Sequence, residues 1–196
     1  MDIKKRVSYI EDSWKKRYNE LNKIFDFKKN LNKIHLDFGC GFGAFVNILS
    51  NHFPNTKFYG QDIDMGEIDL GKSIYKNKNL NLICSEVITG KYDSISIIFT
   101  LHELVGDMDE ILKSLHKSLN ENGKIYIYDH RKVSKKIFQK FYQKNMIHQD
   151  APFQEEYDKY NKWLVKEFKT IMEKAGFITK KIKKDGDFYL YYIGEK

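Results

Sequence analysis

The sequence has little cysteine, little proline and no long hydrophobic run. Its two cysteines, Cys40 and Cys84, are too few for a disulfide framework or a cysteine-based metal site. No uninterrupted apolar run reaches the roughly 18 residues that a transmembrane helix needs. The first residues, MDIKKRVSYIEDSWKKRY, lack the apolar core and cleavage site of a secretory signal. These absences predict a soluble, reduced, cytoplasmic domain with no membrane contact.

The chain does contain enough apolar residues to bury a core. It has 196 residues, of which 41% are hydrophobic and 15% aromatic, and this composition excludes wholesale disorder. The net charge of +7 comes mostly from lysines that are spread along the chain among Asp and Glu. Such spacing favours an ordinary solvated surface, so a nucleic-acid partner is left open by the charge but is not favoured.

Residues 1–32 are predicted to form a helical N-terminal cap before a domain at 33–196. The apolar residues of the cap recur at three- and four-residue steps, which is typical of an amphipathic helix. This stripe consists of Val7, Ile10, Trp14, Tyr18, Leu21 and Phe25.

From Lys33 onward, short apolar runs alternate with amphipathic segments, which predicts βαβ units and a parallel sheet covered by helices on both faces. The predicted strands are Ile34–Phe38, Lys57–Gly60, Leu80–Cys84, Ser94–Phe99 and Lys124–Tyr128. The predicted helices are Ala44–Phe53, Gly66–Lys76 and Met108–Asn120, and Asn122-Gly123 predicts a tight turn after the last of them.

The C-terminal part predicts a different pattern. One long helix is expected from about Gln154 to Ala175-Gly176, followed by two strands, Phe177–Lys183 and Asp187–Ile193, joined by a turn at Asp185-Gly186. The sheet would therefore have seven strands and end in an antiparallel hairpin. Residues 130–153 are polar and weakly periodic, which predicts an irregular insertion or lid.

The most informative stretch is IHLDFGCGFGA, in which an apolar strand runs through Asp37 into Gly39, Gly41 and Gly43 and then into a helix. Glycines allow a sharp turn and let a ligand approach the backbone, while the helix start offers unpaired N–H groups. A phosphate-binding loop would not place Asp37 there, because like charges repel, and no Gly-Lys-Ser/Thr follows.

Two further strand ends support a nucleoside-type ligand. Asp62 ends the next strand about twenty residues after the glycines, where a carboxylate can accept hydrogen bonds from ribose hydroxyls. Ser85 and Glu86 follow the third strand at the same predicted edge.

These motifs together resemble the class I S-adenosylmethionine-dependent methyltransferases. LDFGCGFG is similar to the first motif of that family, FYGQDID to its second-strand acid, and KYDSISIIFTLHEL to its fourth strand and exit. LNENGKIYIYDH and EKAGF resemble its later elements, in the same order along the chain. The resemblance implies a three-layer, doubly wound Rossmann-like α/β fold and S-adenosyl-L-methionine as cofactor, with S-adenosyl-L-homocysteine as product.

The resemblance also implies which residues bind the cofactor. Asp37 and the loop of Gly39, Cys40, Gly41 and Gly43 would hold its methionine end. Asp62 would accept the ribose hydroxyls and Ile63 would pack on the adenine. The adenine amino group would lie near Ser85 and Glu86, and the methyl-transfer face would be lined by Thr100 and Leu101. The interval from Glu86 to Tyr92 is short compared with many family members.

Candidate catalytic residues leave neighbouring strands at the same edge of the sheet: His102 after the fourth strand, and Asp129 and His130 after the fifth. A histidine there can act as general base for a hydroxyl or amine acceptor, or it can simply fill space beside the cofactor. The histidines show no metal-ligand spacing, so no metal site is predicted.

The expected function is methyl transfer to a small-molecule acceptor. Thr100-Leu101-His102-Glu103 stands where base-modifying amine methyltransferases carry Asp/Asn-Pro-Pro-Tyr, which disfavours that reaction. Two other classes stay open: an RNA or protein methyltransferase that uses the basic surface, and a member that binds the cofactor without catalysis. The oligomeric state stays open as well.

Overall fold

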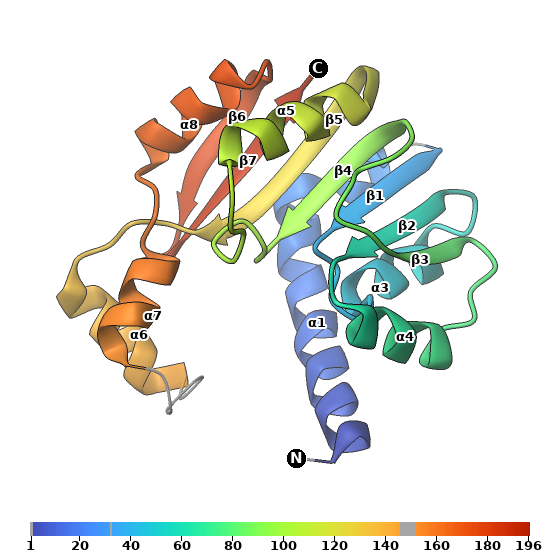
Figure 1. Cartoon of the computed structure of the whole chain (residues 1–196), viewed down its shortest axis with the longest axis horizontal. Helices are drawn as coiled ribbons and strands as arrows, with labels where there is room; N and C mark the ends of the chain where they lie inside the picture. Colours follow the sequence, from blue (N-terminus) through green and yellow to red (C-terminus); the bar gives the residue numbers. More distant parts are fainter. Residues whose placement is uncertain (1, 32, 146–151) are drawn as a thin grey trace.

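The computed structural model describes residues 2–31, 33–145 and 152–196. Its central feature is one seven-stranded sheet with the strand order β3-β2-β1-β4-β5-β7-β6 (Figure 1). Helices cover both faces of this sheet, which confirms the predicted three-layer α/β architecture. None of the helices in the described ranges is both long and apolar enough to cross a membrane.

Five parallel strands precede the terminal hairpin, and β7 runs antiparallel to both of its neighbours. The strand order reverses direction between β1 and β4, and ligands of open α/β sheets bind outside the carboxyl ends of the strands at such a point. The strands are β1 (Ile34–Phe38), β2 (Lys57–Asp62), β3 (Leu80–Cys84), β4 (Tyr92–Ile98), β5 (Leu119–His130), β6 (Ile178–Asp185) and β7 (Tyr189–Glu195).

The two faces of the sheet bury separate cores. On one face, α1 (Ile3–Phe25), α2 (Phe27–Asn30), α3 (Ala44–His52) and α4 (Met65–Ile74) pack through a core that includes Leu21, Phe45 and Phe58. On the other face, α5 (Met108–Ser118) and α8 (Val165–Lys174) pack through a core that includes Leu112, Ile125 and Phe168. The buried residues of α1 all lie in its C-terminal half, at Tyr18, Leu21 and Phe25, and its N-terminal half projects beyond the sheet (Figure 1).

The predicted turn at Asn122-Gly123 lies inside β5 instead of preceding it. Tyr92 pairs with Leu119, whereas the next partners are Ser94 and Lys124, so the intervening residues of β5 bulge out of the ladder. Asn122 adopts a left-handed φ of 61°, which is the local geometry that the Asn-Gly pair favours.

The predicted long helix after Gln154 is broken into α7 (Phe153–Tyr160) and α8. The break coincides with hydrogen bonds to the chain that leaves β5: Val133 N–H donates to Asn161 Oδ1, and Lys132 N–H donates to the Trp163 carbonyl at 2.7 Å. The Trp163 carbonyl would bond within the helix if the helix were continuous, so its bond to Lys132 goes with the break, and periodicity alone does not reveal these long-range contacts.

Residues 130–153 were expected to be irregular, and this was wrong for much of the segment. β5 continues to His130, and Lys135–Asn145 form α6. The helix buries Phe138 against the ring of Tyr160 on α7, at a centroid distance of 6.1 Å. Residues 146–151, which belong to the predicted lid, lie outside the described residues. The division into a cap at 1–32 and a domain at 33–196, and the role of a lid, stay proposals.

Candidate functional site

The glycine loop between β1 and α3 is built from left-handed backbone. Gly39, Gly41 and Gly43 have φ values of 73°, 54° and 86°, a region that L side chains rarely adopt. A Cβ on Gly39 would lie 2.0 Å from Thr100 Cγ2, and one on Gly43 would lie 2.8 Å from the side chain of Leu82. The loop therefore requires glycine at these two positions for packing within the protein.

Gly41 differs from the other two glycines of this loop. A Cβ built on Gly41 would meet no atom within 4 Å, so its backbone is open to an approaching molecule. Its N–H donates to Asp62 Oδ2 at 2.7 Å, and Asp62 Oδ1 accepts from Asp64 N–H at 3.0 Å. The half-buried Asp62 carboxylate is thereby held beside the open stretch of the glycine loop.

Asp37 is the second carboxylate of the site, and it is only 3% exposed. Ser96 on β4 donates to Asp37 Oδ1 at 2.5 Å. Burial raises the pKa of Asp37 to about 7, the Ser96 hydrogen bond opposes this increase, and the charge of Asp62 adds to it. Two neighbouring carboxylates favour a cationic ligand and repel an anionic one.

Sequence analysis missed His35, which lies behind Asp37 and is fully buried. Its Nδ1 is 2.8 Å from Ser94 Oγ and its Nε2 is 2.9 Å from Ser96 Oγ. The sequence does contain the alternating patterns His-x-Asp on β1 and Ser-x-Ser on β4. These patterns point to a contact only once the strand register is known, because that register pairs His35 with Ser94 and Asp37 with Ser96.

Cys40 lies in the loop as predicted, with its thiol packed toward Gly60 of β2. Burial, together with the charges of Asp37 and Asp62, raises the pKa of this thiol well above its usual value. A protonated, buried thiol is a poor nucleophile, so the structure gives Cys40 no covalent chemistry.

The structure brings Ile63, Ser85 and Glu86 to the ends of β2 and β3. Ile63 is 71% exposed, which is unusual for an apolar side chain, and it lies directly after Asp62. Ser85 N–H donates to the Asp62 carbonyl at 3.0 Å. Gln61, which sequence analysis missed, is buried and donates to the carbonyls of Ser85 and Val87, so it fixes this loop.

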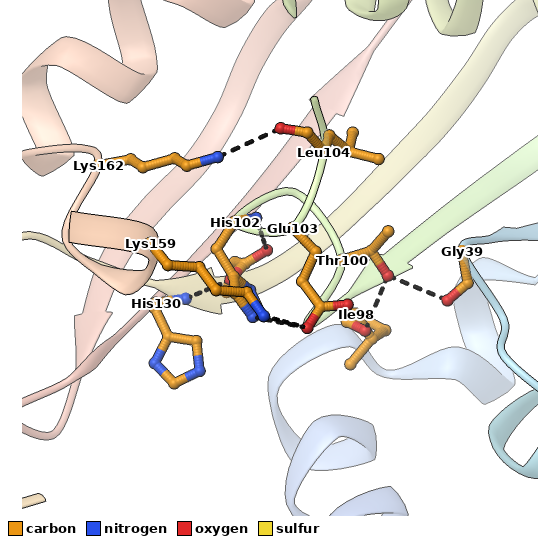
Figure 2. Close-up of polar contacts among 10 residues, drawn as sticks. Gly39, Ile98, Thr100, His102, Glu103, Leu104, His130, Lys159 and Lys162 are labelled. Carbon is orange, nitrogen blue, oxygen red and sulfur yellow. Dashed lines mark hydrogen bonds and ion pairs between the residues drawn. The ribbon is translucent and has the colours of Figure 1, made fainter. Parts of the chain in front are cut away.

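Thr100 and Leu101 occupy different environments, although they are adjacent in sequence. Thr100 Oγ1 donates to the Gly39 carbonyl at 3.0 Å and so ties the end of β4 to the glycine loop (Figure 2). Leu101 is fully buried in the core under α5 and α8. Its side chain therefore points into the apolar layer, so only its backbone is left to line the methyl-transfer face, and that role of Leu101 stays a prediction.

His102 and Asp129 form a buried hydrogen-bonded pair between the ends of β4 and β5. His102 Nδ1 lies 2.7 Å from Asp129 Oδ1, and His102 N–H donates to Asp129 Oδ2 (Figure 2). A carboxylate at Nδ1 keeps the proton on that nitrogen, which leaves Nε2 as the basic one. The Nε2 atom lies 3.7 Å from Glu103 Oε1, and Glu103 is paired in turn with Lys159.

His130 is the third residue of this group, and its environment is aromatic. Its ring contacts those of His102 and Tyr160 at centroid distances of 4.8 and 4.6 Å. Burial lowers the pKa of His130 to about 3, so the ring is neutral at physiological pH. A neutral imidazole here can hydrogen-bond to a ligand but is a weak base.

Ligand atoms of His102, Asp129 and His130 lie within 4.8 Å of one another, a spacing that a metal ion would also require. The Asp129 oxygens, however, already accept from two backbone N–H groups and lie against His102 Nδ1. The arrangement therefore fits an acid–histidine pair, and the absence of a metal stays a prediction.

A cavity of about 290 Å³ lies in front of His130. Helix α1 contributes Tyr9, Ser13 and Arg17 to its wall, and the sheet edge contributes Phe99, His130 and Tyr189. The remaining wall comes from α6 and α7, with Phe138, Phe141, Tyr142, Glu156 and Tyr160. His102 stacks on Tyr160 with 4.5 Å between ring centroids. Nothing in the sequence indicates that helices so far apart along the chain share one cavity.

Comparison with known proteins agrees with this geometry. Residues 36–125, which run from β1 to β5, match a family model described as a methyltransferase domain. These 90 of the 196 residues are similar to a methyltransferase domain, in agreement with the class I S-adenosylmethionine-dependent methyltransferases that the motifs resemble. The matched residues contain the glycine loop, Asp62 and His102, and this confirms the resemblance inferred from the motifs.

Two curated proteins that the chain resembles are considerably longer than it is. It is 30% identical over 160 residues to O-methyltransferase 3 of Dictyostelium discoideum, and the match covers 69% of this chain and 36% of the relative. It is 28% identical over 94 residues to malonyl-[acyl-carrier protein] O-methyltransferase of Priestia megaterium, covering 46% and 34%, respectively. The chain thus spans about a third of the length of these relatives.

Solved structures of methyltransferases share the fold at low sequence identity. A plantazolicin methyltransferase, BpumL, superposes with a TM-score of 0.75 at 19% identity, covering 98% of this chain and 90% of that one. A SAM-dependent methyltransferase from Aquifex aeolicus superposes with a TM-score of 0.68 at 20% identity, covering 90% and 88%. At these identities the likeness establishes the fold.

Proposed function

We propose that this chain binds S-adenosylmethionine at the glycine loop and transfers its methyl group to a small molecule held in the neighbouring cavity. The observation that supports this most directly is the open backbone of Gly41 beside the fixed carboxylate of Asp62. A molecule that occupies this position reaches the sheet edge from which Phe99 and His130 line the cavity.

The residues of the site fit this cofactor. S-adenosylmethionine carries a sulfonium and an ammonium group, and the two carboxylates Asp37 and Asp62 favour such positive charge. Asp62 would accept the ribose hydroxyls, and exposed Ile63 offers an apolar surface to the adenine. The backbones of Ser85 and Glu86 lie at the neighbouring strand end, where the adenine amino group would be bound.

The cofactor supplies an electrophilic methyl carbon, and the protein must position an acceptor and remove its proton. For a hydroxyl acceptor, the cofactor would supply the methyl group and would leave as S-adenosylhomocysteine, and the acceptor would lose its proton. The hydroxyl proton would pass to Nε2 of His102, whose other nitrogen is held by Asp129. The neutral His130 would hydrogen-bond the acceptor at the cavity wall.

Asp62→Ala tests the cofactor assignment. Removing this acceptor should weaken binding of S-adenosylhomocysteine by about 1.5–3 kcal/mol, roughly 10- to 100-fold, as expected for hydrogen bonds to a charged group. Isothermal titration calorimetry measures this directly. The matched control is Asp69→Ala, which removes an exposed carboxylate of α4 and should leave affinity unchanged.

Equal affinities of wild type and Asp62→Ala would contradict the assignment. An acceptor screen with labelled cofactor and fractionated metabolites then tests catalysis. Transfer only to RNA or protein fractions would replace the small-molecule acceptor, and tight binding without transfer to any fraction would indicate a non-catalytic member.

A further inference from the structure

The cavity in front of His130 has walls that are mostly aromatic. On the α6–α7 side, Phe138 is close to the rings of Phe141 and Tyr160, with centroids 6.0 and 6.1 Å apart. On the sheet side, Phe99 and Tyr189 are 5.4 Å apart. Such a wall offers the negative faces of several rings to whatever occupies the cavity.

One acidic side chain interrupts this aromatic wall. Glu156 on α7 lines the cavity and is only 8% exposed. Within the described residues, its carboxylate has no hydrogen bond and no ion pair with another side chain. Among the described residues, Arg131 Nε is the one fully enclosed side-chain nitrogen or oxygen without a hydrogen-bond partner, so the Glu156 oxygens still reach the cavity and are open to a cationic ligand.

The position of Glu156 in its helix does not explain this burial. Glu155 and Glu156 both lie in the first turn of α7, where the helix dipole favours negative charge. Glu155 is nevertheless exposed to solvent. The dipole therefore accounts for acidic residues in this turn but not for the placement of one of them on a cavity wall.

The nearby cations are occupied elsewhere. Arg17, on the α1 side of the cavity, pairs with Glu20 at 2.9 Å, and its guanidinium lies over the rings of Phe99 and Tyr189. Lys159, next to Tyr160, pairs with Glu103 at 3.1 Å. The Arg17 contacts show that these rings accept a cation, while Glu156 still lacks one among the described side chains.

We propose that the methyl acceptor carries a protonated or quaternary amine, which Glu156 and the surrounding aromatic faces bind. The amine is an anchor: it holds the acceptor so that another atom, a hydroxyl oxygen in the reaction above, faces His130 and the cofactor. A carboxylate and aromatic rings together recognise a substituted ammonium through charge and cation–π attraction. This inference rests on the proposed function for its reaction but not for its binding test.

The binding test uses pairs of probes that differ in charge. Tyramine is compared with 4-ethylphenol, and choline with 3,3-dimethylbutanol, by calorimetry on the full chain saturated with S-adenosylhomocysteine. In wild type, at least one cation should bind about 10- to 100-fold more tightly than its uncharged counterpart. Glu156→Gln should abolish this preference, whereas the control Glu155→Gln should retain it.

The outcomes separate this proposal from the methyltransferase assignment. If neither cation is preferred by wild type, or if Glu156→Gln keeps the preference, the amine anchor is wrong even when S-adenosylhomocysteine binds. If S-adenosylhomocysteine does not bind, the proposed function fails, and the same probe titration without it still tests Glu156.

A stability measurement provides a second readout. Without an amine ligand, Glu156→Gln should raise the thermal midpoint by about 1–2 °C, since it removes a carboxylate without a partner from a mostly aromatic wall. Glu155→Gln should change it little. A lower midpoint for Glu156→Gln would show that the carboxylate stabilises the fold, and this result would overturn the proposal.

Discussion

The cofactor half and the acceptor half of the site are built in different ways. Around the glycine loop, the protein uses backbone and short hydrogen bonds from β1, β2 and β4, and a Cβ on Gly39 or Gly43 would collide with a neighbouring side chain. Around the cavity, it uses large side chains from α1, α6 and α7 together with the sheet edge. The shape of the glycine loop is therefore fixed by backbone contacts. The cavity wall consists of separate side chains, each of which we expect to tolerate substitution on its own.

This difference indicates a division of labour. A site made of backbone tolerates little change, which suits a ligand that is the same for a whole family. A site made of side chains on separate helices can be altered without disturbing the sheet, which suits a ligand that differs between members.

The largest expected effect is that of His102→Ala, which should change catalysis without changing cofactor binding. Loss of a general base should reduce the turnover number by about 10²- to 10⁴-fold while the affinity for S-adenosylhomocysteine barely changes. Steady-state kinetics with the acceptor found in the screen, together with calorimetry, measures both quantities. Full turnover in both His102→Ala and His130→Ala would remove the two histidines from the mechanism.

The next effect is confined to the cofactor half and depends on pH. Asp37 has a pKa of about 7 in the folded chain, against an ordinary value of 3.8. A raised carboxyl pKa contributes stability that is complete below about pH 4 and is lost as the pH rises through 7, by at most about 4 kcal/mol. Relative to wild type, Asp37→Asn should therefore gain stability between pH 4 and 8.

Chemical denaturation of both proteins across this pH range provides the test. Saturation with S-adenosylmethionine should make the stability difference between the two proteins depend less on pH, because a cationic ligand stabilises the ionised carboxylate. Parallel pH profiles for wild type and Asp37→Asn would show that Asp37 does not hold its proton in the folded chain.

The smallest effect distinguishes two glycines of the same loop. Gly39→Ala should lower the free energy of unfolding by about 2–4 kcal/mol, since its Cβ meets Thr100 in a left-handed backbone. Gly41→Ala meets no protein atom, so it should cost only about 1 kcal/mol while it weakens cofactor binding. Equal losses of stability would mean that Gly41 is not open to a ligand.

Sequence reasoning was most successful in the cofactor half. β1 and β3 have the predicted bounds, and the acids at Asp37 and Asp62 lie where the motif order placed them. These features are local, because a strand, a glycine turn and a helix start depend on a few consecutive residues. Leu101 shows the limit of such reasoning, since its direction depends on which face of the sheet the chain enters after β4.

The acceptor half could not be predicted in the same way. Tyr9, Phe138, Glu156 and Tyr189 come from four separate elements, and no periodic pattern relates them. The break at Asn161 depends on a hydrogen bond from Val133, which only the folded chain brings close. Contacts between distant segments determine this half of the site.

Helix α1 connects the two halves mechanically. Its N-terminal half contributes Tyr9 and Ser13 to the cavity. The same turns contact α4 through the Arg6–Glu67 ion pair at 2.6 Å, and the Tyr75 hydroxyl, just after α4, donates to Glu11 at 2.9 Å. Because α4 begins at Met65, just after Asp62, helix α1 contacts both the cavity wall and the element that follows the proposed cofactor site. Any free energy by which a filled cavity shifts cofactor affinity must equal the shift that the cofactor exerts on the acceptor. We therefore expect the size of this coupling to depend on how α1 packs against α4 and the cavity.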